Sequence, residues 1–267
     1  MTQLGRSAAP ELGPVLQPTA RRRFTLRETL HQTYLCAKGF YHFVRHPESR
    51  ETFTALSEAL VRFRANRDSV DYLLADPAVA QICRERYTGR RHTVAQLIEY
   101  PAGSLGHELA AAMIAHNHDP EFYRDFYGET PPDFRNDEEY LRFRIRQTHD
   151  IVHVLTGFAM NEFPGELGMQ AFIAVQTRRP FCIALVGLGL IRIILKPHEL
   201  SSTLRQVAKG LAMGYQAKSF VAHRFEEDWA KPVAEWRSEL GLVEDSSFEM
   251  GSPAPAVTET QEQRQQC

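Results

Sequence analysis

Two histidines and an aspartate in the segment His149–His153 have side chains that commonly bind divalent metals. His149 and His153 are four residues apart, so on an α-helix they project from one face, one turn apart. With about 3.6 residues per turn, Asp150 lies about 100° around the helix from His149 and about 60° from His153. The spacing therefore predicts that the three side chains share one sector of a helix.

A fourth ligand follows after a turn. Gly157 and Pro164-Gly165 indicate that the helix ends and the chain reverses, so Glu166, at the start of the next helix, can return a carboxylate to the same point. Two imidazoles and two carboxylates suit Zn²⁺, Mn²⁺ or Fe²⁺ and leave positions for water or substrate. Because no thiolate is offered, a closed structural zinc site is not favoured. The competing interpretation is a helix whose histidines simply bond to neighbouring acids.

Two other classes of metal enzyme fit this segment less well. Zinc proteases carry a glutamate between their histidines as general base, whereas Asp150 is one carbon shorter and no third ligand follows at the expected interval. An HD-type phosphohydrolase would combine His149-Asp150 with another histidine and aspartate. The residues available for that set are His107, His116 or His118, and Asp228. This alternative leaves His153 and Glu166 without a role.

Helical spacing of apolar residues dominates the chain, and no alternating run typical of a strand occurs. We predict an all-α fold, with one compact multi-helix domain over residues 24–244 and disordered tails at 1–23 and 245–267. The helices expected are 24–44, 53–63, one opening at Pro77 after the cap Asp76, a short one capped by Thr93, one starting at Ser104, and one long helix to Phe158 from the cap Asn136, with Glu139 completing a capping box.

The most apolar stretch, Phe181–Leu195, is shorter than the roughly 20 residues that a membrane-spanning helix needs, and it contains Arg192. We expect either a buried core helix or a helix that faces a lipid tail or rests in a membrane interface. The candidates to line a tail groove are Phe181, Ile183, Leu185, Leu188 and Leu190, and the same residues would pack an ordinary core.

Composition limits the function classes. The 267-residue chain has 43% apolar residues and a net charge of −2, so it lacks the basic field that holds nucleic acid. The first 23 residues contain no continuous apolar run, which argues against a secretory signal, and their arginines fit a disordered tail or a mitochondrial presequence. The four cysteines form no CxxC pair and are expected to be reduced, mostly buried thiols. They are Cys36, Cys83, Cys182 and Cys267.

Motifs along the chain resemble the Coq4 family of ubiquinone-biosynthesis proteins. That family is marked by HDxxH, about eleven residues and a glutamate, which His149-Asp150, His153 and Glu166 match. The other matching segments are Tyr100–Glu108 (YPAGSLGHE, like the family's YPxGSLGxE), Asn136–Glu139, Arg144–Arg146, Gly165–Glu166, Gln170–Phe172, Phe225–Trp229 and Glu239–Leu242, and the resemblance covers residues 24–244. One departure is that twelve residues, and not eleven, separate His153 from Glu166. A loop absorbs such an insertion, and Glu162 is a second candidate ligand if it does not.

The resemblance implies metal-dependent oxidative decarboxylation, in which a hydroxyl replaces the C1 carboxylate of a polyprenylated 4-hydroxybenzoate-derived precursor. The implied ligands are His149, Asp150, His153 and Glu166, holding Zn²⁺ or, as alternatives, Mn²⁺ or Fe²⁺. The alternative is a non-catalytic prenyl-lipid scaffold that organises the biosynthetic enzymes. Either Arg144 or Arg146 is a candidate to pair with a substrate carboxylate or phosphate, although solvated surface arginines are the more ordinary expectation.

The resemblance also suggests where the protein works and with what. The partners implied are the quinone precursor and other ubiquinone-biosynthesis proteins, and a homodimer fits the apolar helical surface. Contact with a membrane would be peripheral. The expected place is cytoplasmic, on the inner face of the membrane, or the matrix side of the mitochondrial inner membrane in a eukaryote.

Overall fold

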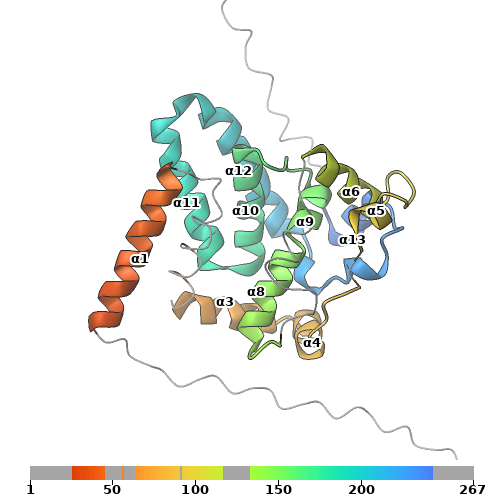
Figure 1. The fold of residues 1–267 in the computed structure, drawn as a ribbon, viewed down its shortest axis with the longest axis horizontal. Coiled ribbons are helices and arrows are strands. Elements are labelled where there is room, and N and C mark those ends of the chain that lie inside the picture. Colours follow the sequence, from red (N-terminus) through yellow and green to blue (C-terminus); the bar gives the residue numbers. More distant parts are fainter. Residues whose placement is uncertain are drawn as a thin grey trace, which may run out of the picture.

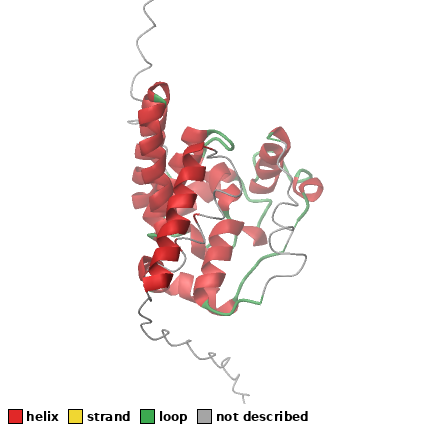
Figure 2. Cartoon of the chain, turned by 60° about the vertical axis from the view of Figure 1, so that its left-hand side comes forward, coloured by secondary structure: helices red, strands yellow, loops and turns green. Residues whose placement is uncertain are grey.

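The computed structural model of the chain describes residues 26–45, 56, 60, 64–90, 92–116 and 133–242. Within these ranges every regular element is a helix and no β-strand forms, so the all-α prediction is confirmed (Figures 1 and 2). The helices are α1 (Leu26–Arg45), α3 (Arg64–Leu74), α4 (Pro77–Glu85), α5 (Val94–Leu97), α6 (Leu105–Ala115), α8 (Asp137–Gln147), α9 (His149–Thr156), α10 (Phe163–Thr177), α11 (Pro180–Leu195), α12 (Leu200–Gln216) and α13 (Val233–Leu240), with 3₁₀ turns η1 (Pro197–Glu199), η2 (Phe220–Ala222) and η3 (Phe225–Glu227). The predicted tails and the predicted helix 53–63 lie outside the described ranges, apart from Leu56 and Leu60.

The predicted helix starts are confirmed because their signals act within a few residues. Asp76 accepts a hydrogen bond from the backbone of Ala78, and Thr93 forms a capping box with Gln96. Asn136 accepts from the backbone N–H of Glu139, but only half of the box expected there forms. The Glu139 carboxylate bonds to Arg135 instead.

The single long helix predicted from Asn136 to Phe158 is wrong. Thr148 separates α8 from α9, with φ −88° and ψ 0°. Its hydroxyl donates to the carbonyl of Arg144 at 2.9 Å, a bond that bends helices by competing with the backbone. As a result the two histidines lie on a short separate helix of eight residues.

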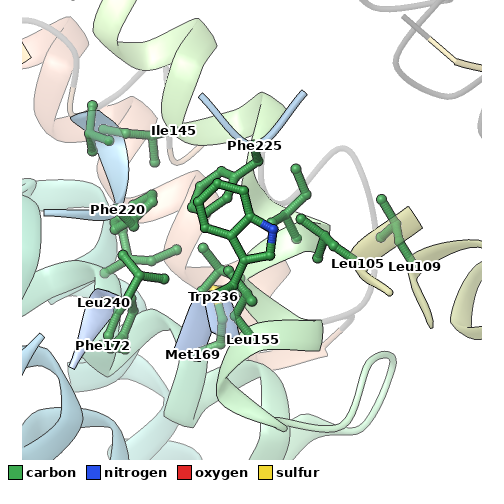
Figure 3. Close-up of a cluster of buried hydrophobic side chains, with 14 of the residues drawn as sticks. Leu105, Leu109, Ile145, Leu155, Met169, Phe172, Phe220, Phe225, Trp236 and Leu240 are labelled. Carbon is green, nitrogen blue, oxygen red and sulfur yellow. The ribbon is translucent and has the colours of Figure 1, made fainter. Parts of the chain in front are cut away.

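The core surrounds α9 and α10. In Figure 1, α10 lies between α1 and α11 on one side and α6 and α13 on the other. Buried aromatic rings from several segments meet beside α9, among them Phe172, Phe220, Phe225 and Trp236 (Figure 3). On the other face, α10 and α12 touch through their backbones, since a Cβ added to Gly210 would lie 2.0 Å from the carbonyl oxygen of Gly168.

The apolar helix α11 is buried on one face only. Cys182 and Leu185 lie in the core, whereas Ile183, Leu190 and Ile191 are exposed. The predicted core helix therefore contributes one face to the core and leaves the other exposed. None of the described helices is both long and apolar enough to cross a bilayer.

Two of the four cysteines can be placed. Cys83 and Cys182 are free and buried, as predicted for reduced thiols. Burial raises the pKa of Cys182 to about 11, which leaves its thiol protonated at neutral pH. Cys267 and the side chain of Cys36 lie outside the described residues.

Candidate metal centre

The turn between α9 and α10 brings the predicted ligands together. Gly157 ends α9 in the left-handed conformation, with φ +72°. Gly165 lets the first turn of α10 lie directly against this turn, because a Cβ there would lie 2.3 Å from the carbonyl oxygen of Ala159. The backbone N–H of Asn161 donates to Oε1 of Glu166 at 3.1 Å. The turn therefore absorbs the extra residue and directs Glu166 toward the histidines.

His149, His153 and Glu166 each offer a ligand atom, and these atoms lie within 4.8 Å of one another. Nε2 of His153 is 3.3 Å from Oε1 of Glu166, and Nε2 of His149 is 3.9 Å from Oε2. Glu162, the second candidate ligand, is exposed at the N-cap of α10 and is not part of the group. The geometry thus favours Glu166 despite the longer interval.

The hydrogen bonds of His153 prepare its other nitrogen for a metal. Nδ1 lies 3.0 Å from the carbonyl oxygen of Phe158, which can only accept, so Nδ1 carries the proton. Nε2 then holds a lone pair, and it is buried without a hydrogen-bond partner among the described residues. Buried polar nitrogens rarely lack a hydrogen-bond partner. A metal ion fits this arrangement, since ligating histidines donate their other ring N–H to a carbonyl or carboxylate.

Asp150 lies behind His149 and not beside the three ligand atoms. Its Oδ1 is 2.9 Å from Nδ1 of His149, so the carboxylate accepts the ring proton and leaves Nε2 facing Glu166. The sequence predicted a direct ligand here. The structure brings together three of the four predicted ligands and gives Asp150 the geometry of an orienting partner.

The two arginines before His149 lie in different surroundings. Arg144 is completely buried, and its guanidinium donates to Glu226, to Gln147 and to the carbonyl of His223. The expectation of a solvated arginine is therefore wrong for Arg144, and a guanidinium so enclosed has no path to a substrate. Arg146 is half-buried and has partners of its own.

The residues needed for an HD-type phosphohydrolase do not gather at this site. Among the described residues, the group that could hold a metal contains neither His107, His116 nor Asp228. Nδ1 of His107 donates instead to the carbonyl of Ile98 at 3.1 Å. His118 lies outside the described ranges. The geometry therefore does not favour this alternative.

Arg237 of α13 is a residue near the site that sequence reasoning missed. Its Nε donates to the carbonyl of Leu155 at 2.8 Å and its Nη2 to that of Val154 at 3.3 Å. These are carbonyls of the last turn of α9, which have no partner within the helix. A cation there also complements the helix dipole. No local signal reveals this contact, because more than 80 residues separate the partners.

Protonation competes with a metal at His153. Burial alone lowers the pKa of His153, but the Glu166 carboxylate outweighs it and leaves the pKa raised above that of a free imidazole, about 6.5. Burial likewise raises the pKa of Glu166, and the two histidines outweigh that effect and lower it. In the metal-free protein the pair therefore stabilises the fold most between about pH 4.5 and pH 6.5. This contribution is lost as pH rises through the raised pKa of His153.

Metal affinity is expected to have the opposite pH dependence. A ligating imidazole must be neutral, so the affinity for Zn²⁺ should fall as pH drops through the raised pKa of His153. Calorimetric titration at about pH 8 and about pH 6 should show severalfold weaker binding at the lower pH. Equal affinity at both values would contradict a role for His153 as ligand.

Fold and site together define a helical protein with a candidate metal centre of two histidines and a glutamate on consecutive helices. The chain belongs to the Coq4 family, because the family model described as "Coenzyme Q (ubiquinone) biosynthesis protein Coq4" matches residues 25–245. The resemblance drawn from the motifs is thereby confirmed.

Similar proteins include curated COQ4 homologs and one protein of known structure. The mitochondrial ubiquinone biosynthesis protein COQ4 homologs of Xenopus tropicalis and Homo sapiens are both 31% identical to this chain, over 177 and 178 residues. Each match covers 65% of this chain, and 60% and 64% of the relatives. The chain thus matches less than two thirds of their length. A crystal structure of a protein from Nostoc punctiforme PCC 73102 assigned to ubiquinone biosynthesis has a TM-score of 0.68 at 26% identity, covering 79% of this chain and 98% of that one.

Proposed function

We propose that this protein carries out a metal-dependent oxidative decarboxylation in ubiquinone biosynthesis, in which a hydroxyl replaces the C1 carboxylate of a polyprenylated 4-hydroxybenzoate-derived precursor. The observation that supports a metal is the convergence of His149, His153 and Glu166 around the buried Nε2 of His153, which makes no hydrogen bond among the described residues. Family membership supports the pathway. The carboxyl carbon leaves as CO₂, water supplies the hydroxyl oxygen, and dioxygen accepts the two electrons and two protons released to become hydrogen peroxide.

The side chains divide into ligands and orienting partners. His149, His153 and Glu166 would hold the ion, most simply Zn²⁺, with Mn²⁺ or Fe²⁺ as alternatives. When bound, it would act as a Lewis acid toward the carboxylate and the neighbouring oxygen of the ring. Asp150 keeps His149 in the tautomer that presents Nε2, and the Phe158 carbonyl does the same for His153.

A prenyl substrate fits a protein that touches a membrane, and one surface suits this contact. Most of the exposed large apolar side chains in the described ranges belong to three helices. They are Leu30, Tyr34 and Tyr41 of α1, Ile183, Leu190, Ile191, Ile194 and Leu195 of α11, and Leu200, Leu204, Leu211 and Tyr215 of α12. At the connection between α11 and α12, Ile194 and Leu195 are 78% and 66% exposed, beside the exposed Lys196 and His198. Exposed apolar tips of this kind suit a membrane interface.

Charges at this tip are expected to release the protein from membranes. Replacing both Ile194 and Leu195 with aspartate should lower the fraction that sediments with phosphatidylcholine–cardiolipin vesicles by roughly tenfold, because carboxylates resist transfer into the interface. Ile114→Asp, at a residue of α6 that is 59% exposed, is the matched control and should bind as the wild type does. If the wild type is a dimer that does not bind vesicles, and the double variant is a monomer, the surface is a homodimer interface instead.

The same surface is the specific observation that favours the second candidate, a scaffold that presents a prenyl lipid to other enzymes without chemistry of its own. The deciding experiment is aerobic incubation of the purified, metal-loaded chain with a prenylated 4-hydroxybenzoate-type acid, followed by mass spectrometry. Conversion of carboxyl to hydroxyl by the wild type, and not by His153→Ala, would establish the enzyme. No conversion with the metal in place would favour the scaffold.

A further inference from the structure

A cavity outside the metal centre lies where the loop that follows α4 meets the segment around η3. It has a volume of about 690 Å³, within the range of about 300–1,000 Å³ that small-molecule sites occupy. None of the candidate metal ligands lines it. The residues that line this second cavity are Arg86, Tyr87, Thr88, Gly89, Arg90, His92, Tyr100, Glu226, Glu227 and Trp229.

Aromatic rings form much of its wall. The ring of His92 lies 5.9 Å from that of Trp229 and 6.2 Å from that of Tyr100, measured between centroids. Two hydrogen-bond donors in this wall, Nε1 of Trp229 and the hydroxyl of Tyr87, have no partner among the described residues. The wall therefore offers aromatic surface against which a planar ligand can stack.

The acids that line the second cavity already have basic partners. Glu226 is neutralised by the buried Arg144, and Glu227 lies 3.4 Å from Arg224, which also pairs with Glu85. Arg86 is paired with Asp137 at 2.7 Å.

The remaining cation of the wall is Arg90. It is exposed, and no ion pair joins it to another residue in the described part of the chain. A ligand here meets an available guanidinium, while the acids beside it already have partners. Arg90 therefore gives an anionic group of a ligand a guanidinium with which it can pair.

Close backbone contacts fix the walls. Gly106 donates its N–H to the carbonyl of Trp229 at 2.9 Å, and Val233 donates to that of Gly103 at 2.9 Å. Gly106 at the first of these contacts is tightly enclosed, because a Cβ there would lie 2.8 Å from the ring of Tyr100. Gly89, in the loop that follows α4, is also enclosed, because a Cβ there would lie 2.6 Å from Glu226. The segments 100–108 and 225–229, which stood out in the sequence and have no role in the metal centre, are thus held together around this cavity.

We propose that the second cavity binds a planar aromatic anion, with its ring among His92, Tyr100 and Trp229 and its anionic group on Arg90. A phosphate-bearing base and an aromatic carboxylic acid share this chemistry. Arginine pairs with either group through its planar fork of donors, and aromatic side chains stack with either ring. The proposal does not depend on the decarboxylase activity, because no candidate metal ligand takes part.

Isothermal titration calorimetry on the full-length, chelator-treated chain tests this proposal, since removing metal excludes anion binding at the metal centre. The probes are adenosine monophosphate and 4-hydroxybenzoate, with adenosine and inorganic phosphate as the ring alone and the anion alone. At least one of the first two should bind at least tenfold more tightly than both controls. Arg90→Gln should weaken that binding about tenfold. Arg205→Gln, at an exposed arginine of α12, should not change it.

Each outcome decides the question. Binding of the monophosphate alone identifies a nucleotide-type ligand, and binding of the hydroxybenzoate alone an aromatic acid. If neither binds, or if phosphate alone binds as tightly, the proposal is overturned. Unchanged binding by Arg90→Gln also overturns it, and this variant changes only an exposed side chain, so a folding defect does not obscure the result.

Discussion

Replacing Glu166 with glutamine is expected to remove the proposed metal and the proposed decarboxylation together. The Glu166 carboxylate lies 3.3 Å from Nε2 of His153 and 3.9 Å from Nε2 of His149, and it carries the only negative charge of the three-residue group. An amide of the same shape keeps the turn but loses that charge, so affinity should fall at least about 100-fold. Elemental analysis after dialysis measures the loss, and mass spectrometry of the product measures the activity.

Glu162→Gln is the matched control, because it makes the same change one turn earlier on an exposed side chain. It should leave metal content and activity at wild-type levels. The Glu166 side chain is 33% exposed, so its isosteric replacement should also keep the fold, which circular dichroism checks. Loss of metal in Glu162→Gln alone would move the ligand back by one turn. Retained metal with lost activity in Glu166→Gln would instead assign Glu166 to the substrate.

The sequence predicts most reliably what neighbouring residues determine. Asp76, Thr93 and Ser104 mark true helix starts, since a cap bonds to backbone only two or three residues ahead. His149 and His153 share a face because the helix period alone requires it. Glu166 was within reach of prediction because glycines and a proline mark the turn before it.

Residues whose surroundings come from distant segments are predicted poorly. The basic stretch around Arg144 predicts a surface arginine. Its partner Glu226 lies 82 positions away in the sequence, and only the fold brings the two together. At the break, the carbonyl of Arg144 accepts the hydroxyl of Thr148 as well as its backbone N–H, and apolar periodicity does not reveal this second bond. Asp150 shares the correct sector, but helical angle does not show that its carboxylate turns toward His149.

Breaking the buried ion pair between Arg144 and Glu226 is expected to cause a large loss of folding stability. Arg144→Leu should reduce the free energy of unfolding by about 3–5 kcal/mol, because Glu226 is left buried without its counter-charge. Arg224→Leu, which breaks a partly exposed pair with Glu85, should cost at most about 1 kcal/mol and serves as the control. Urea titrations measure the loss of unfolding free energy in both variants, provided that the m-value stays the same.

The double variant Arg144→Leu/Glu226→Leu separates the penalty of a stranded charge from the value of the pair itself. It should recover most of the stability lost in Arg144→Leu, since apolar side chains of similar size often replace a buried pair at little cost. If the single variant is as stable as the wild type, Glu226 is protonated or hydrated there and the pair does not hold α8 against η3. If only the single variant loses metal affinity, the stranded charge disturbs the junction at Thr148, whose hydroxyl bonds to the carbonyl of Arg144, and the pair then positions the metal helix as well as stabilising the fold.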